Sequence, residues 1–123
     1  MTFPNFIILY VNNPAASADF YANLLGKTPV ENSPAFALFA LDSGLMFGLW
    51  AKHKVEPTTT LSGGGGELAF SVADMNTVDT LHTDWKNRGL IIAQPPTDMD
   101  FGHTFVALDP DGHRLRVFSP SAA

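Results

Sequence analysis

The stretch FIILYVNNPAASADFYANLLG, residues 6–26, and the stretch ELAFSVADMNTVDTLHTDWKNRG, residues 67–89, lay out the same two elements in the same order. Each begins with a run of apolar and β-branched residues that is typical of a strand. In each, Asn or Asp then follows as a helix cap, apolar residues recur at helical spacing, and glycine ends the helix. The chain therefore contains a strand–helix unit twice.

Three short strands are expected after each helix. They cover residues 28–31, 35–41 and 45–51 in the first half, and residues 91–93, 101–108 and 114–119 in the second. Residues 42–44 and 109–112 are rich in Asp and Gly and predict tight turns between the last two strands of each half. Aligning the turns pairs Asp42 with Asp109 and Gly44 with Gly112. The predicted fold class is α+β, with two βαβββ modules.

The modules are expected at residues 1–51 and 67–123, within a single domain of residues 1–123. Residues 52–66 between them contain Pro57 and four consecutive glycines, which predicts a flexible connector. A phosphate-binding loop is disfavoured there, because the glycines lack the Gly-Lys-Ser/Thr ending. Each module covers one sheet face with a helix and buries too little surface to be stable alone. We therefore expect the two curved open sheets to form a shared cleft for a small molecule.

Composition excludes several classes of function. The chain has seven Lys+Arg against twelve Asp+Glu, so nucleic acid and anionic membranes are poor partners. It has no cysteine, which excludes disulfides and thiolate-ligated zinc. The apolar run of residues 6–11 is too short for a membrane span or a signal peptide, so a cytoplasmic protein is expected. Open sheet edges predict a homodimer.

This organisation resembles the glyoxalase, bleomycin resistance and extradiol dioxygenase superfamily, also called vicinal oxygen chelate, over essentially the whole chain. Its most specific local marks are residues 19–21 (DFY) with 24–26 (LLG), and residues 109–113 (DPDGH) before the last strand. Metal-dependent members place one ligand on the first and last strand of each module. Carried over, these places fall on Phe6, Gly48, Glu67 and Arg116. One carboxylate is too few for a metal site, so the resemblance implies neither metal nor cofactor.

Glu67 and Arg116 have opposite charge at places that converge in the family geometry. We expect an ion pair there instead of a metal; the alternative is that each contacts solvent or backbone separately. Because side chains alternate along a strand, these positions also indicate which other residues of the same strands face the cavity. The predicted ligand-binding residues are Phe6, Tyr10, Met46, Gly48, Trp50, Glu67, His103, Arg116 and Phe118. The alternatives are a core role for Trp50 and no ligand contact for His103. Trp85 is expected in the core.

A closer resemblance is to superfamily members that confer resistance to phenazine antibiotics, carried by stretches such as residues 47–50 (FGLW) and 101–105 (FGHTF). Such proteins sequester a planar tricyclic molecule between aromatic side chains without chemistry. The resemblance implies metal-independent binding of a small aromatic ligand and no catalytic residue. One alternative is a glyoxalase-like lyase, isomerase or dioxygenase with a non-standard metal site built from residues such as Glu67 and His103. Another is a metal-free enzyme with Glu67 as base.

Overall fold

The computed structural model describes residues 2–61 and 63–121, and the chain divides between residues 62 and 63 into two compact units. The division falls inside the predicted connector. The first unit contains β1 (Phe6–Val11), α1 (Pro14–Leu25), β2 (Glu31–Asn32), β3 (Phe36–Ala40), β4 (Met46–Ala51) and a short 3-10 helix (Lys52–Lys54). Its sheet has the order β1-β4-β3-β2, with β1 parallel to β4 and the other pairs antiparallel.

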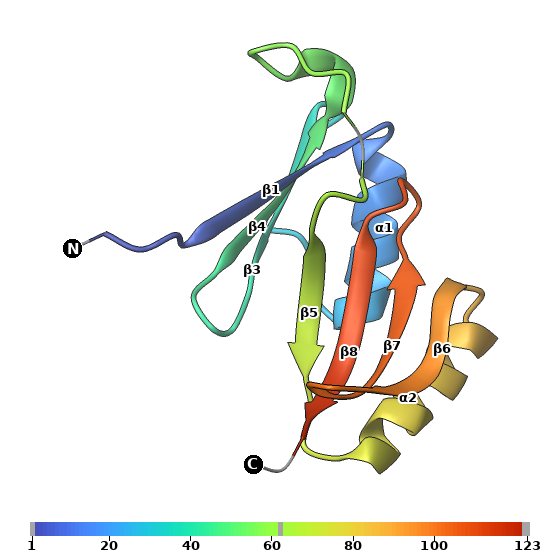
Figure 1. Ribbon diagram of the computed structural model, residues 1–123. Helices are drawn as coiled ribbons and strands as arrows, with labels where there is room; N and C mark the ends of the chain where they lie inside the picture. The colour runs from blue at the N-terminus through green and yellow to red at the C-terminus, as the bar shows by residue number, and fades with distance from the viewer. Residues whose placement is uncertain (1, 62, 122–123) are drawn as a thin grey trace. The chain divides into compact units, whose positions relative to one another are not determined.

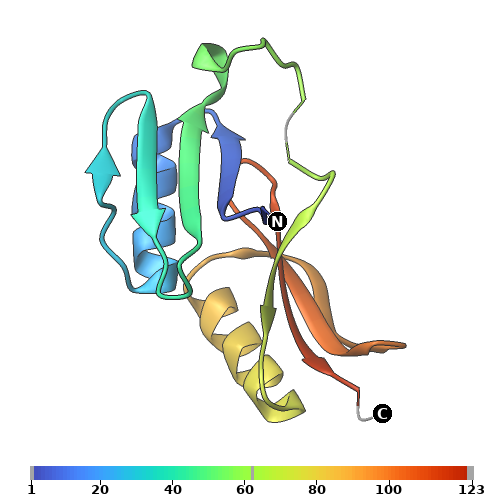
Figure 2. The ribbon, with the colours of Figure 1, turned by 90° about the vertical axis from the view of Figure 1, so that its left-hand side faces the viewer.

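The second unit repeats this architecture. It contains β5 (Glu67–Ser71), α2 (Met75–Asn87), β6 (Ile91–Met99), β7 (Gly102–Leu108) and β8 (Arg114–Pro120). The strands lie side by side in the order β5-β8-β7-β6, with β5 parallel to β8 (Figure 1). Helix α1 packs on β3 and β4, and α2 on β6, β7 and β8; Figure 2 shows α1 along one face of the first sheet. The prediction of two βαβββ modules is confirmed.

Both helices begin and end where their local chemistry predicts. The side chain of Asn13 accepts a hydrogen bond from the backbone N–H of Ala16 at 3.2 Å, and Asp74 accepts one from Thr77 at 2.8 Å. These bonds satisfy N–H groups that the first helical turn leaves unpaired. At the other end of α1, Gly26 adopts a left-handed conformation with φ 65°, which costs glycine little.

Register shows which positions of the two modules are equivalent. Phe6 of β1 lies opposite Met46 of β4, and Glu67 of β5 lies opposite Arg114 of β8. Met46 of β4 and Arg114 of β8 therefore occupy equivalent positions. Counting on along the two strands, Gly48 is equivalent to Arg116, and Trp50 is equivalent to Phe118. At these equivalent positions the residues of the first module are apolar, and those of the second module are mostly polar or charged.

The turns correct one predicted alignment. The N–H of Gly44 donates to the carbonyl of Leu41 at 2.9 Å, and the N–H of Gly112 donates to that of Asp109 at 3.1 Å. Leu41, rather than Asp42, is therefore the counterpart of Asp109. The Asp109 carboxylate is buried and accepts hydrogen bonds from the backbone N–H groups of Asp111 and His113. These bonds stabilise the turn between β7 and β8.

Strand β6 is longer than predicted. It runs to Met99 instead of residue 93, with register shifts on either side of Gln94. Pro95 and Pro96 made the sequence resemble a loop, because proline cannot donate to a sheet ladder. As β6 is the outer strand of its sheet, the missing donors are tolerated.

Candidate functional site

The face of the first sheet away from α1 is apolar. On β4, Phe47 and Leu49 are buried towards α1, and the Tyr21 ring packs edge-on against Phe47 with centroids 4.8 Å apart. On β1, Phe6 and Tyr10 are the outward-facing residues, 43% and 36% exposed. The predicted alternation along these two strands is therefore correct. We call this outward side the aromatic face; it comprises Phe6, Ile8, Tyr10, Phe36, Leu38, Ala40, Met46, Gly48 and Trp50.

Trp50 lies between two other aromatic residues of the aromatic face. Tyr10 on β1 and Phe36 on β3 are its register partners on either side. The Tyr10 and Trp50 rings have centroids 6.4 Å apart and planes at 77°, an edge-to-face arrangement. Trp50 is half-buried, whereas Trp85 is only 5% exposed and packs against Phe70 and Phe105. The prediction that Trp85 is a core residue is confirmed.

Two rings of the protein itself lie over Gly48. A Cβ atom at this position would be 2.8 Å from Cζ of Phe36 and 3.2 Å from Cε1 of Phe6, closer than ordinary contact. The glycine therefore lets these rings approach the strand backbone. Phe36 was missed as a site residue, although its alternation with buried Ala37 and its register opposite Trp50 place it on the aromatic face.

The face of the second sheet away from α2 carries more polar and charged side chains than the aromatic face. On β8, Leu115 and Val117 are fully buried, so Arg114, Arg116 and Phe118 point to the other side. We call this side the polar face; it comprises Glu67, Ala69, Ser71, Gln94, Thr104, Val106, Leu108, Arg114, Arg116 and Phe118.

The predicted ion pair between Glu67 and Arg116 is confirmed. Nε and Nη2 of Arg116 donate to the two carboxylate oxygens of Glu67 at 2.7 and 2.9 Å, a bidentate arrangement. The side chains are 16% exposed for Arg116 and 30% for Glu67. The hydrogen bonds from Arg116 hold the pKa of Glu67 below its ordinary value, although partial burial opposes the shift.

Arg116 is also held by its other neighbours. Its Nη1 donates to Oγ1 of Thr104 at 3.1 Å and to Oε1 of Gln94 at 3.3 Å. Its guanidinium lies 5.6 Å from the centre of the Phe101 ring, and Phe101 packs edge-on against Phe118 at 5.9 Å. A hollow of about 350 Å³ opens beside Arg116, lined by Ala93, Gln94, Met99, Val106, Arg114 and Arg116.

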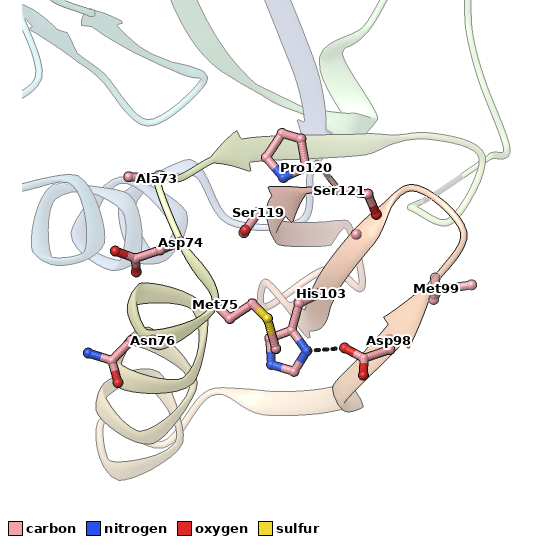
Figure 3. Close-up of a pocket in the computed structure, with 11 residues that line it drawn as sticks. Ala73, Asp74, Met75, Asn76, Asp98, Met99, His103, Ser119, Pro120 and Ser121 are labelled. Atoms are coloured by element: carbon pink, nitrogen blue, oxygen red, sulfur yellow. Dashed lines mark hydrogen bonds and ion pairs between the residues drawn. The ribbon is translucent and has the colours of Figure 1, made fainter. Parts of the chain in front are cut away.

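His103 does not belong to the polar face. Its neighbour Thr104 lies opposite Phe118 on that face, so His103 points to the helix side with Phe105. Its Nδ1 lies 2.7 Å from a carboxylate oxygen of Asp98 on β6, as Figure 3 shows. Its Nε2 lies 2.7 Å from a carboxylate oxygen of Asp79 on α2. It lines a different hollow, of about 710 Å³, between the start of α2 and the ends of β6 and β8. We therefore leave His103 out of the site.

The two carboxylates give His103 a pH-dependent structural role. Hydrogen bonds to Asp79 and then to Asp98 raise the pKa of His103, against the effect of burial. Only the imidazolium donates from both nitrogens, so deprotonation removes one bond. Because the pKa is raised on folding, the stabilisation is complete below about pH 6.5, the unfolded value, and is lost as pH rises through the folded value.

His103→Gln should therefore lower the free energy of unfolding at pH 6 by more than at pH 9. The measurement is urea unfolding across this pH range. His53→Gln, an exposed histidine in the 3-10 helix, is the control and should leave the pH profile of the wild type unchanged. A difference between wild type and His103→Gln that is constant with pH would refute the double pairing.

The residues at the family's ligand positions do not fit a metal ion. Both oxygens of Glu67 are occupied by the Arg116 guanidinium, and the Phe6 and Phe36 rings cover Gly48. Among residues 2–61 and 63–121, no three His, Asp or Glu side chains gather as a metal ion would require. Over the same residues, no helix is long and apolar enough to cross a membrane.

Comparisons with known proteins agree with this fold. Residues 4–117 match the model of the Glyoxalase/Bleomycin resistance protein/Dioxygenase superfamily. The phenazine antibiotic resistance protein EhpR of Enterobacter agglomerans is 32% identical over 118 residues, which cover 93% of this chain and 89% of that protein.

Solved structures with a similar fold include two that cover almost the whole chain. A protein of Agrobacterium tumefaciens, solved by NMR, is 52% identical with a TM-score of 0.92, over 99% of this chain and 100% of that one. A glyoxalase-related enzyme of Fulvimarina pelagi is 22% identical with a TM-score of 0.82, over 97% of this chain and 88% of that one, and shares the fold. The chain therefore belongs to the glyoxalase/bleomycin resistance protein/dioxygenase superfamily.

Proposed function

We propose that the protein binds a small planar aromatic compound of the phenazine type, without a metal and without transforming it. The observation that carries this proposal is the aromatic face, where Trp50 lies between Tyr10 and Phe36 in a sheet surface without charge along β1, β3 and β4. Flat apolar ligands are held by such surfaces, with a few polar groups for orientation. The similarity to a phenazine antibiotic resistance protein supports the same ligand class.

The proposed site for the ring system is the aromatic face of the first unit, with Phe6, Tyr10, Phe36, Met46 and Trp50, and with Gly48 beneath the Phe6 and Phe36 rings. The predicted contacts Glu67, Arg116 and Phe118 lie on the polar face of the second unit, where Glu67 and Arg116 are bound to one another, and they remain a separate prediction. Each stacked aromatic pair contributes about 0.5–1.5 kcal/mol beyond the burial of area. Two such contacts and the desolvation of a tricyclic ring give an affinity of about 1 μM, which corresponds to roughly −8 kcal/mol.

The enzymatic alternatives fit the residues less well. A metal held by Glu67 and His103 is disfavoured because these side chains lie on opposite faces of the second sheet. Glu67 as a general base is disfavoured because Arg116 lowers the pKa of its carboxyl group, which weakens it as a proton acceptor. Glu67 is bound by Arg116, and His103 is bound by Asp79 and Asp98, so neither side chain is free to act as a metal ligand or a general base.

Native mass spectrometry tests the proposed function in one experiment. Protein purified and treated with chelator is mixed with phenazine, and the complex is weighed and then dissociated. We expect metal-free protein that carries phenazine of unchanged mass. Stoichiometric zinc, iron, nickel or manganese in untreated protein, binding that chelator abolishes, or release of a product of different mass would contradict the proposal.

We further propose that the chain is a single domain that forms a homodimer. Within each unit the sheet ends in outer strands, β1 and β2 in one and β5 and β6 in the other, and unpaired outer strands favour association. Light scattering at micromolar concentration should give a species of twice the 13.3 kDa chain mass. A single species at the chain mass would contradict the dimer.

A further inference from the structure

Strand β2 adds a carboxylate to the edge of the aromatic face. Glu31 lies opposite Leu38 of β3 in the antiparallel register, and Asn32 lies opposite Ala37. Opposed residues of two antiparallel strands point to the same side of the sheet. Ala37 is fully buried, whereas Leu38 belongs to the aromatic face, so the side chain of Glu31 lies on that face as well.

The charge of Glu31 is not neutralised by another described residue. Within residues 2–61 and 63–121 its carboxylate forms no hydrogen bond and no ion pair, and the residue is exposed. Of the three lysines in the first unit, Lys27 pairs with Asp42 at 2.6 Å. Lys52 and Lys54 lie beyond the end of β4, in the 3-10 helix. The Glu31 carboxylate is therefore available to a ligand.

The rings of the aromatic face also favour positive charge. The face of an aromatic ring carries negative charge density and attracts a cation, and tryptophan does so most strongly. Tyr10, Trp50 and Phe36 occupy neighbouring positions on three adjacent strands. The residues that make up the aromatic face on β1, β3 and β4 include no lysine or arginine. A cationic ring system should be held here more tightly than a neutral one of the same shape.

A molecule of three fused rings is long enough to contact both Trp50 and the neighbourhood of Glu31. One strand, β3, separates β4 from β2, so two strand spacings of together about 10 Å lie between them. This is close to the length of three fused six-membered rings. Leu38 on β3 is half-buried and provides apolar surface between the two positions.

We infer that the aromatic face selects planar aromatic cations, of which an N-alkylated phenazinium is the simplest, and that Glu31 pairs with their positive charge. The inference rests on the proposed function, because it names the charge of the ligand that the same face binds. The net charge of −5 also attracts cations at long range, so the test has to separate this general effect from Glu31. The preference should weaken as salt is added, because the carboxylate is exposed.

Calorimetric titration of the full chain with phenazine and with N-methylphenazinium tests the inference. The two molecules share the ring system and differ in one methyl group and one positive charge. We expect the wild type to bind the cation about fivefold more tightly at low salt. Glu31→Gln should lower this preference to about twofold, because only the attraction of the rings remains. Glu31→Asp, which keeps the charge on a shorter side chain, should retain more of it.

Asp19→Asn is the matched control. It removes one negative charge from the same unit, but Asp19 is an exposed residue of α1, which packs on the other side of the sheet. It should keep the full preference. The preference is a ratio of two affinities measured on one variant, so a partly unfolded sample does not distort it.

Three results would overturn the inference and leave the proposed function standing. They are equal binding of phenazine and N-methylphenazinium by the wild type, the full preference in Glu31→Gln, and a loss in Asp19→Asn as large as in Glu31→Gln. The last result would mean that net charge alone sets the preference. If neither molecule binds the wild type, the proposed function itself fails.

Discussion

Trp50→Ala is expected to weaken the binding of a planar aromatic compound about tenfold, a loss of roughly 1.4 kcal/mol. The substitution removes the central ring of the row formed by Tyr10, Trp50 and Phe36, and with it the largest flat surface of the aromatic face. One stacking partner is worth about 0.5–1.5 kcal/mol, which sets the size of the effect. Calorimetry is the measurement, because the variant lacks the indole that a fluorescence titration would follow.

Trp85→Phe is the control for this experiment. Trp85 packs against Phe70 and Phe105 in the core of the second module and is only 5% exposed to solvent. Its replacement by another aromatic residue should leave ligand affinity unchanged, even where it lowers stability. Unchanged affinity in Trp50→Ala would show that the ligand does not stack on Trp50, and the aromatic face would lose its proposed role.

Removing Arg116 should have the largest effect on stability. We expect Arg116→Gln to lower the free energy of unfolding by about 2 kcal/mol, between the values typical of exposed and of buried pairs. The substitution leaves the half-buried Glu67 carboxylate unpaired and removes the hydrogen bonds to Thr104 and Gln94. Urea unfolding of Arg116→Gln, Glu67→Gln and the double variant measures the coupling between the two residues.

The ion pair between Glu67 and Arg116 should make the free energy of unfolding fall in acid. Because folding lowers the pKa of Glu67, the stabilisation is complete above about pH 4.3, the unfolded value, and is lost as pH falls through the folded value. Glu67→Gln should remove this part of the acid profile. Lys27→Gln is the control: Lys27 also lowers the pKa of its partner Asp42, but Asp42 is 92% exposed, so solvent screening should keep the effect on stability much smaller. Strictly additive effects of Glu67→Gln and Arg116→Gln would contradict the pairing.

Much of the fold was predictable because its signals are local. The caps Asn13 and Asp74 and the glycines after each helix specify helix ends within a few residues, without tertiary information. The strand β6 was cut short because its two prolines resemble a loop. Only its place at the outer edge of the sheet, which a single sequence does not state, makes them compatible with a strand.

The direction in which side chains face was predictable where strand parity could be anchored. On β1, β4, β5 and β8 the family's ligand positions fixed which residues face away from the helices, and the register agrees. On β7 no such anchor existed, and a ligand contact was predicted for His103 only from its place at the start of a strand next to Gly102; the register puts its side chain on the helix side. On β3 there was no anchor either, and Phe36 was missed. The partners of Arg116 beyond Glu67 depend on cross-strand register, which sequence alone did not give.

Titration calorimetry of chelator-treated wild-type protein with phenazine tests the central claim most directly. It measures in one experiment whether a planar aromatic compound binds and whether a metal is needed. We predict binding at about 1 μM, with heat and affinity unchanged when zinc or manganese is restored. No heat of binding, or binding that appears only when metal is added, would contradict metal-independent binding of an aromatic ligand.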